Sequence, residues 1–304
     1  MISIVVISKD EPELDATLSG VAAEAARSAE PCEIVVVDAS EGRLDHLAAA
    51  HPGVRWLRYD RPPGVRVSIP HQRNVGVRAA DGDVVVFTDA GCLPAEGWLG
   101  ELLAPLAKDG EDVVAGVATG PAGHAGLYDR DALRVPEYLE ECPTINLAFR
   151  RSVFDAVGGF DESFEYGSDV DFSWRVTAAG YRIRSAPAAR VVHDWGDRRR
   201  QARRSYAYGK ARARLYLKHR SRLPRLPRTE PMVVAYPVYL LGLPVAVAAA
   251  AVAPPWSVLV LPGYLALLLV PAWRNRRNGA ARVVVDHLVY GAGVLAETAG
   301  RFRR

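Results

Sequence analysis

Val84-Val85-Val86-Phe87-Thr88-Asp89-Ala90-Gly91-Cys92 is the stretch that decides the predicted fold of this 304-residue chain. Its first four residues are apolar and mostly β-branched, which is typical of a strand buried on both faces of a parallel sheet. The strand ends in Asp89, and open α/β sheets bind ligands at the carboxyl ends of their strands. A carboxylate followed closely by glycine suits a metal-bound phosphate that approaches the backbone. The alternative is that Asp89 caps a helix beginning near Pro94.

Strands and helices alternate around this stretch. Apolar runs predict strands at 2–8, 33–38 and 54–59, and helical spacing of apolar residues predicts helices at 13–29, 44–50 and 70–80. Further helices are expected at 98–107, 152–157, 169–179 and 199–219, and further strands at 113–118, 146–150 and 181–185. This alternation predicts an α/β fold with a doubly wound mixed sheet. Because no G-x-G-x-x-G follows the first strand, we do not expect a dinucleotide-binding domain.

Charge is distributed very unevenly along the chain. Residues 1–197 carry a net charge of −14, whereas 198–228 contain 13 basic residues and no acidic one. Anionic lipid would attract such a basic stretch, and a single basic stretch beside an acidic domain does not indicate a nucleic-acid partner. Cys32, Cys92 and Cys142 are far apart and lack metal-ligand spacing, which favours a reducing cytoplasmic compartment.

Two long apolar segments follow the basic stretch. Residues 232–253 and 256–273 contain no charged side chain, and each is long enough to cross a bilayer. Arginines flank both ends of the pair, which predicts a membrane helical hairpin with both ends in the cytoplasm. Prolines inside the segments make a re-entrant hairpin an alternative, and a buried helical pair in a soluble domain is the other. The amphipathic stretch 283–299 is expected at the membrane interface.

Four motifs occur in order along the acidic part of the chain. They are Asp89-Ala90-Gly91, Gly158-Gly159-Phe160-Asp161-Glu162, Ser168-Asp169-Val170-Asp171-Phe172-Ser173-Trp174-Arg175 and Val191-Val192-His193. As a set they resemble the motifs of family 2 glycosyltransferases, which have the GT-A fold and use nucleotide-diphosphate sugars. The resemblance covers about residues 1–220 and implies a catalytic domain there. Composition and hydropathy predict that a basic Pro-rich linker at 221–231, the hairpin at 232–273 and a cytoplasmic or interfacial helix within 274–304 follow it.

The resemblance implies a donor site at the carboxyl edge of the sheet. Its nucleotide-binding residues would be Ser8, Glu11, Asp38, Arg73, Asn74 and Asp89. Asp89 matches the first aspartate of the family's D-x-D metal motif, and Gly91 replaces the second. With His193, Asp89 would hold Mn²⁺ or Mg²⁺, and an imidazole ligand favours Mn²⁺. Taken alone, Asp38 also reads as a strand-end cap, Arg73 as a surface charge and His193 as a structural loop residue.

The resemblance also implies an acceptor side. Asp169 matches the aspartate of the family's Glu-Asp motif, which acts as general base, and Ser168 stands in place of the glutamate. The alternative is that Asp169 caps the helix that it begins. Asp171 and Arg175 are i,i+4 neighbours, which predicts a structural ion pair. The residues placed near the donor sugar or acceptor are Trp98, Asn146 and Ser168.

These features predict an inverting, metal-assisted glycosyltransferase at a bacterial inner membrane, with its catalytic domain in the cytoplasm. The expected partners are a UDP, GDP or dTDP sugar, a lipid-linked or envelope glycan acceptor, and membrane lipid. Gln201-Ala202-Arg203-Arg204-Ser205 departs from the Q-x-x-R-W motif of processive synthases, so transfer is expected to be non-processive. The alternative is a catalytically degenerate membrane scaffold, which Gly91 and Ser168 keep open. A sugar nucleotidyltransferase is disfavoured because no Gly-rich phosphate loop follows Ile7.

Overall fold

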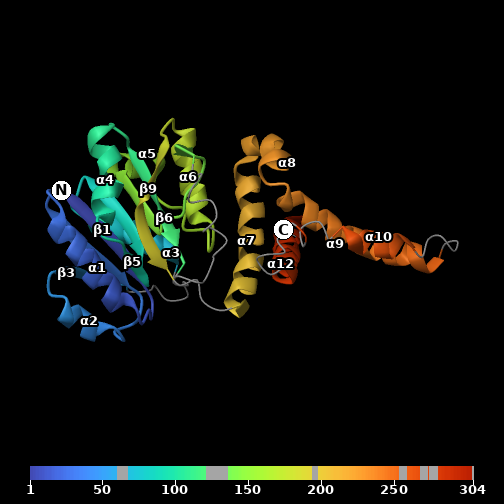
Figure 1. Ribbon diagram of the computed structural model, residues 1–304, viewed down its shortest axis with the longest axis horizontal. Helices are drawn as coiled ribbons and strands as arrows, with labels where there is room; N and C mark the ends of the chain where they lie inside the picture. The colour runs from blue at the N-terminus through green and yellow to red at the C-terminus, as the bar shows by residue number, and fades with distance from the viewer. Residues whose placement is uncertain are drawn as a thin grey trace. The chain divides into compact units, whose positions relative to one another are not determined.

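The computed structural model describes residues 1–59, 68–120, 136–193, 198–252, 259–267, 273 and 280–302. The chain divides into two compact units, residues 1–195 and 196–304 (Figure 1). The predicted boundary at 220 therefore lies inside the second unit. The basic helix α7 (Arg198–Lys218) belongs to the second unit because it packs along α12 (Ala280–Phe302). Each unit is described by itself below.

The first unit is built on one mixed sheet, which confirms the predicted α/β class. Its strands are β1 (Ile2–Ser8), β2 (Cys32–Asp38), β3 (Val54–Arg58), β4 (Val84–Asp89), β5 (Cys92–Pro94), β6 (Val113–Thr119), β7 (Tyr138–Leu139), β8 (Asn146–Arg150) and β9 (Ile183–His193). In the described residues they follow the order β3-β2-β1-β4-β8-β6-β9-β5, with β7 also paired to β9. Strands β3, β2, β1 and β4 are parallel, and β8 enters antiparallel between β4 and β6.

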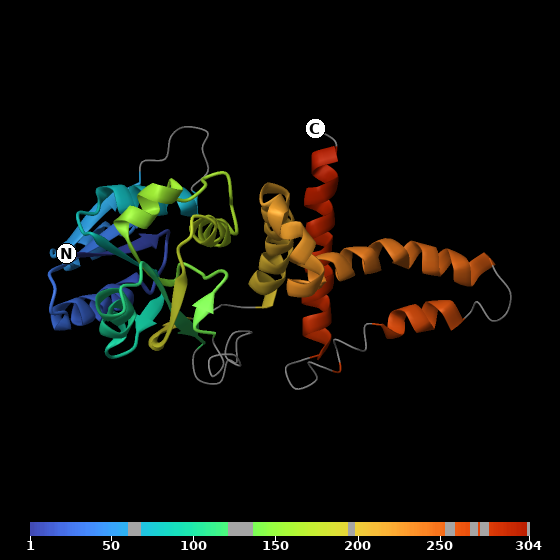
Figure 2. The same cartoon turned by 90° about the horizontal axis from the view of Figure 1, so that it is seen from above.

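Helices cover both faces of this sheet (Figures 1 and 2). They are α1 (Leu14–Arg27), α2 (Asp45–Ala50), α3 (Ile69–Ala79), α4 (Trp98–Lys108), α5 (Arg151–Val157) and α6 (Ser168–Ala178). Alternate residues of β1 serve the two faces: Ile4 and Val6 pack with α1 and α4, whereas Val5 packs with α3, α5 and α6. Burial on both faces explains why β1 and β4 are nearly continuous apolar runs.

The second unit is helical in its described part. It contains α7, the 3₁₀ helix η1 (Arg220–Arg225), α8 (Leu226–Thr229), α9 (Met232–Val252), α10 (Val260–Ala266) and α12. Helices α7 and α12 lie side by side, and they cross closely at Gly209 and Gly293 (Figure 2). A Cβ on either glycine would overlap a backbone carbonyl of the other helix, Tyr290 or Tyr206. The predicted linker at 221–231 is thus largely helical.

One helix in the described part of the chain is long and apolar enough to cross a membrane. It spans Met232–Ala251, and only 17% of its most apolar window is buried within the protein. The second apolar segment appears only as α10, which packs against α9, and most of its remaining residues lie outside the described ranges. A membrane hairpin is therefore not shown. The predicted amphipathic stretch 283–299 does lie within one helix, α12.

Candidate active site

Three of the residues predicted to bind the donor lie at the carboxyl ends of neighbouring parallel strands. In the β1–β2 pairing Ser8 lies opposite Asp38, and in the β1–β4 pairing Ile7 lies opposite Asp89. Ser8 and Asp38 are buried, and the Ser8 hydroxyl has no hydrogen-bond partner among the residues that the structure describes. Asp38 accepts a hydrogen bond from the backbone N–H of Ser40 at 3.1 Å, so it also closes the loop after β2. The predicted carboxyl edge therefore exists as an assembled polar site.

Gly91 brings two more of the predicted residues to Asp89. It has a φ of +87°, and a Cβ built on it would lie 3.6 Å from Glu11 Oε1 and 3.7 Å from His193 Cε1. The sequence motif gave no hint of strand β5, which follows this turn and pairs antiparallel with β9, setting Cys92 directly opposite His193. A second aspartate at position 91 would combine an unfavourable backbone conformation with a like charge beside the Glu11 carboxylate. The left-handed backbone at position 91 thus favours the glycine that departs from the D-x-D motif.

Arg73 is the cation of this site. Its side chain is 6% exposed, so it is not a surface charge, and its guanidinium Nη2 lies 3.5 Å from Asp89 Oδ1. The guanidinium carbon sits 5.7 Å from the centre of the Phe160 ring. In the described part of the chain, Arg73 Nε has no hydrogen-bond partner. A buried, incompletely paired guanidinium suits an incoming phosphate.

Asp169 lies in the first turn of α6, but it is not the residue that caps this helix. Gly167 occupies the N-cap position in a left-handed conformation and has no side chain to offer. Asp169 Oδ1 instead accepts a hydrogen bond from the Val170 backbone N–H at 2.9 Å. Burial raises the pKa of Asp169 above its usual value, and the nearby Arg73 guanidinium opposes that rise. A raised pKa makes the ionised carboxylate a stronger base.

Asn74, which was predicted to bind the nucleotide, has its side-chain amide engaged within the protein. Its amide donates to the Phe160 carbonyl at 2.9 Å and to Glu162 at 2.8 Å, and its oxygen accepts from the Phe160 N–H at 2.8 Å. These three bonds attach α3 to the Gly-Gly-Phe-Asp-Glu loop. Asn74 therefore positions its neighbour Arg73 and the Phe160 ring.

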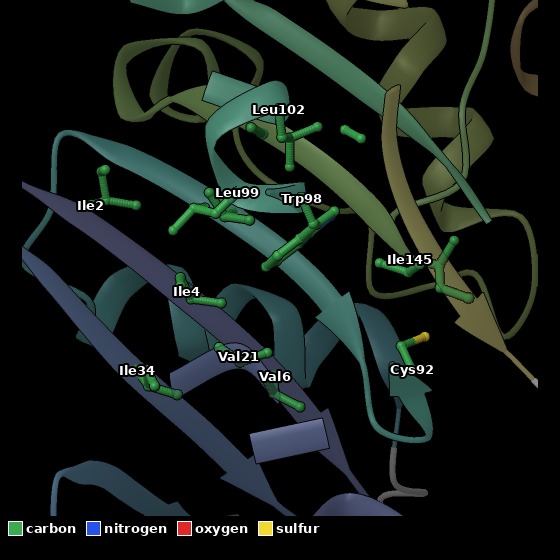
Figure 3. Packing of buried hydrophobic residues seen from close by; sticks show 14 of the residues in the cluster. Ile2, Ile4, Val6, Val21, Ile34, Cys92, Trp98, Leu99, Leu102 and Ile145 are labelled. Carbon is green, nitrogen blue, oxygen red and sulfur yellow. The ribbon is translucent and has the colours of Figure 1, made fainter. Parts of the chain in front are cut away.

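Trp98 and Asn146, which were predicted near the sugar or acceptor, are both buried and bonded to each other. Trp98 is fully buried in the core beside Leu99 and Leu102 (Figure 3). Its indole N–H donates to Asn146 Oδ1 at 2.8 Å, and Asn146, 1% exposed, donates to the carbonyls of Val117 and Ala189. All these polar atoms are satisfied inside the protein, so none is presented to a sugar. Ser168 is also buried, at the start of α6.

The predicted ion pair of α6 is confirmed. Arg175 Nε lies 2.9 Å from Asp171 Oδ2, and Asp171 is completely buried. The same guanidinium donates to the carbonyls of Val157 and Gly159. Asp171 and Arg175 therefore anchor α6 to the Gly-Gly-Phe loop and take no part in the polar edge.

The donor set around Asp89 fits a hard divalent ion that is completed by a ligand. No three His, Cys, Asp or Glu side chains form a ready-made metal cage within the described ranges. Mg²⁺ and similar ions commonly use one or two protein carboxylates and take their other ligands from substrate phosphates and water. Asp89 and His193 suit that arrangement. Cys92 does not, because burial raises the pKa of its thiol to about 12 and keeps it neutral.

Comparisons with known proteins agree with this arrangement. Residues 3–160 match Glycosyl transferase family 2, and residues 141–270 match Glycosyl transferase family group 2. The chain is 31% identical over 221 residues to pre-mycofactocin glycosyltransferase of Mycobacterium tuberculosis, covering 66% of this chain and 45% of that protein. It is 25% identical to glycosyltransferase AglE of Haloferax volcanii, covering 64% and 67%, and 32% identical to succinoglycan biosynthesis protein ExoA of Rhizobium meliloti, covering 59% and 50%. The chain thus spans about half the length of several of these relatives.

Solved structures share the fold. A mannosyltransferase from Pyrobaculum calidifontis, in complex with GDP-Man and Mn²⁺, superposes with a TM-score of 0.69 at 22% identity, covering 94% of this chain and 85% of that one. GalNAc-T7 with UDP, GalNAc and Mn²⁺ superposes with a TM-score of 0.51 at 17% identity, covering 70% and 50%. Both neighbours contain Mn²⁺ together with a nucleotide or a nucleotide sugar. At these identities the likeness establishes the fold.

Proposed function

The chain belongs to glycosyltransferase family 2, and from that premise we propose that it transfers a sugar from a nucleotide-diphosphate sugar to an acceptor hydroxyl, with inversion and one sugar at a time. The observation that carries this proposal is the place of Arg73. It lies 3.5 Å from Asp89 on the donor side and acts electrostatically on Asp169 on the acceptor side. A single buried cation thus links the two halves of a displacement reaction.

On the donor side, Ser8, Glu11 and Asp38 line the place of the nucleotide at the ends of β1 and β2. Asp89 and His193 would hold Mn²⁺ or Mg²⁺, which when bound neutralises charge developing on a diphosphate leaving group. Arg73 offers its guanidinium to the same diphosphate. The bond between the anomeric carbon and the diphosphate oxygen breaks, and the nucleoside diphosphate leaves with the electron pair.

On the acceptor side, Asp169 accepts the proton of the attacking hydroxyl as the hydroxyl oxygen bonds to the anomeric carbon. The raised pKa of Asp169 supports this role, because a base must hold the proton that it takes. Attack from the face opposite the leaving group inverts the configuration at that carbon. Asn74 and the Asp171–Arg175 pair hold the loop and the helix that place these groups.

We place the acceptor at a membrane: a lipid-linked saccharide, a polyprenyl phosphate or an envelope glycan at the cytoplasmic face of a bacterial inner membrane. Helix α9 supports this, since Val238, Leu241 and Val245 each expose more than 60% of their surface. The 13 basic residues of 198–228 suit an anionic lipid surface. Gly91, one of the two residues that support the scaffold alternative, has a local explanation in the positive φ of its turn, whereas Ser168 continues to support that alternative.

A donor screen tests the proposal. UDP, GDP and dTDP sugars are each added with Mn²⁺ to the full-length protein, and thermal unfolding is recorded. A cognate donor at about 100 times its dissociation constant stabilises the folded state by about 2.7 kcal/mol. Asp89→Ala is expected to abolish the Mn²⁺-dependent part of that gain. If no donor stabilises the protein, or if EDTA and Asp89→Ala leave the gain unchanged, the donor site proposed here is wrong.

A further inference from the structure

The segment Glu141–Cys142, just before β8, is attached to the first turns of α6. The backbone N–H of Cys142 donates to Ser173 Oγ at 3.2 Å, and the Ser173 hydroxyl lies 2.9 Å from the backbone carbonyl of Asp169, one turn earlier. The next residue, Trp174, donates its indole N–H to Glu141 Oε2 at 3.0 Å. These bonds hold an acidic side chain beside the helix that carries Asp169, although the two are far apart in sequence.

The charges around Asp169 come from several elements. Arg73 approaches from α3 as the opposite charge, and Glu141 approaches from the segment before β8 as a like charge. Cys142 also lies in this environment, but burial raises the pKa of its thiol to about 12, so it stays neutral. On α6 itself, Asp171 is engaged by Arg175. Glu141 is therefore the acidic neighbour of Asp169 contributed by another element.

We propose that Glu141 is a positioning residue that strengthens Asp169 as a base. The physical reason is that a second negative charge disfavours the ionised form of Asp169, so the proton taken from the acceptor hydroxyl is held more firmly. Trp174 keeps the Glu141 carboxylate in place, and Arg73 limits the effect from the opposite side. The role in catalysis rests on the proposed function, whereas the coupling between the two carboxylates does not.

Direct titration of Asp169 tests the coupling without any donor. The side-chain carboxyl carbon of Asp169 is followed by NMR against pH in the full-length protein, and its resonance is assigned by its loss in Asp169→Asn. Glu141→Gln is expected to move the midpoint of this titration to lower pH. Glu141→Asp, which keeps the charge, should return the midpoint toward the wild-type value. Glu140→Gln is the matched control, because Glu140 is the exposed neighbour and should leave the midpoint unchanged.

An unchanged midpoint in Glu141→Gln, or an equal shift in Glu140→Gln, would overturn the proposal. If Glu141→Gln does not fold, Trp174→Phe removes the indole donor and keeps the charge, and it should also move the midpoint. A Trp174→Phe midpoint equal to wild type would then count against the proposal. Once a donor is known, the acidic limb of the pH profile for nucleotide release should move to lower pH in Glu141→Gln. If the Asp169 midpoint shifts as expected but neither wild type nor any variant releases nucleotide from a donor, the proposed function is refuted and the coupling between the two carboxylates stands.

Discussion

At the scale of single residues, the candidate site is marked by buried polar groups that are incompletely paired. Within the described residues, the Arg73 Nε and the Ser8 hydroxyl are buried without a hydrogen-bond partner, and unpaired buried polar groups cost free energy. A protein retains such groups where a ligand completes them. Asp169 carries a similar cost, because burial disfavours its charged form.

This cost predicts how Asp169→Asn affects stability. The folded-state pKa of Asp169 lies above its unfolded value, so its favourable contribution is complete below the unfolded pKa and is lost as pH rises through the folded pKa. Asparagine does not titrate. The free energy of unfolding of Asp169→Asn relative to wild type should therefore increase from acid to neutral pH in denaturant titrations. A relative stability that falls with pH would contradict the assigned environment.

Asp171→Asn is the informative comparison for that experiment. Asp171 is equally part of α6, but it is fully buried and paired with Arg175 at 2.9 Å. Removing one partner of a buried pair costs on the order of 3 kcal/mol. Asp171→Asn should thus be clearly destabilised, which separates a structural carboxylate from a catalytic one on the same helix.

Gly91 allows a second prediction at this scale. Restoring the D-x-D motif with Gly91→Asp should weaken Mn²⁺-dependent donor binding, since the new side chain starts 3.6 Å from the Glu11 carboxylate. The left-handed backbone adds about 1–2 kcal/mol of strain. Gly110→Asp is the control, because Gly110 has a φ of +69° and open space around it, so it carries only the strain. If Gly91→Asp instead binds the donor more tightly in the presence of Mn²⁺, this prediction is wrong, and the glycine has removed a metal ligand from the site.

At the scale of elements, local pattern predicted the strands and helices of the first half well. β1, β2 and β4 are apolar runs whose pairing follows from alternation with helices, and all three lie close to their predicted bounds. Strand β5 escaped prediction because it is three residues long and exists only by pairing with β9. The burial of Trp98 and Asn146 was not predicted, because motif position carries no information on burial. Glu141 was missed because its nearness to Asp169 arises from tertiary packing.

The boundary between the units gives a prediction about truncation. A chain ending at Arg220 keeps α7 but loses α12, which exposes the buried α7 residues Ala211, Ala213 and Leu215. A chain ending at Trp195 removes α7 as well. Size-exclusion chromatography should find the 1–195 chain monomeric and the 1–220 chain aggregated. A monomeric 1–220 chain that unfolds cooperatively would show that α7 belongs with the first unit.

At the scale of the whole molecule, an acidic unit is joined to a basic and apolar one. Helix α9 exposes a long apolar surface, which insertion into a bilayer would bury. Each basic residue near an anionic leaflet adds about 1 kcal/mol, which salt screens. The full-length protein should therefore stay with membranes through both high salt and carbonate, whereas residues 1–195 should not bind them. Release of the full-length protein by carbonate would refute membrane insertion.

The central claim is that Asp169 acts as the base of a sugar-transfer site completed by Asp89 and Arg73. The most direct test compares wild type and Asp169→Asn for Mn²⁺-dependent nucleotide release from the donor found by screening, with donor affinity measured by calorimetry in parallel. The account predicts unchanged donor affinity and a release rate lower by about 10²–10⁴-fold, the usual contribution of a general base. Release by Asp169→Asn at a rate close to that of wild type would contradict it.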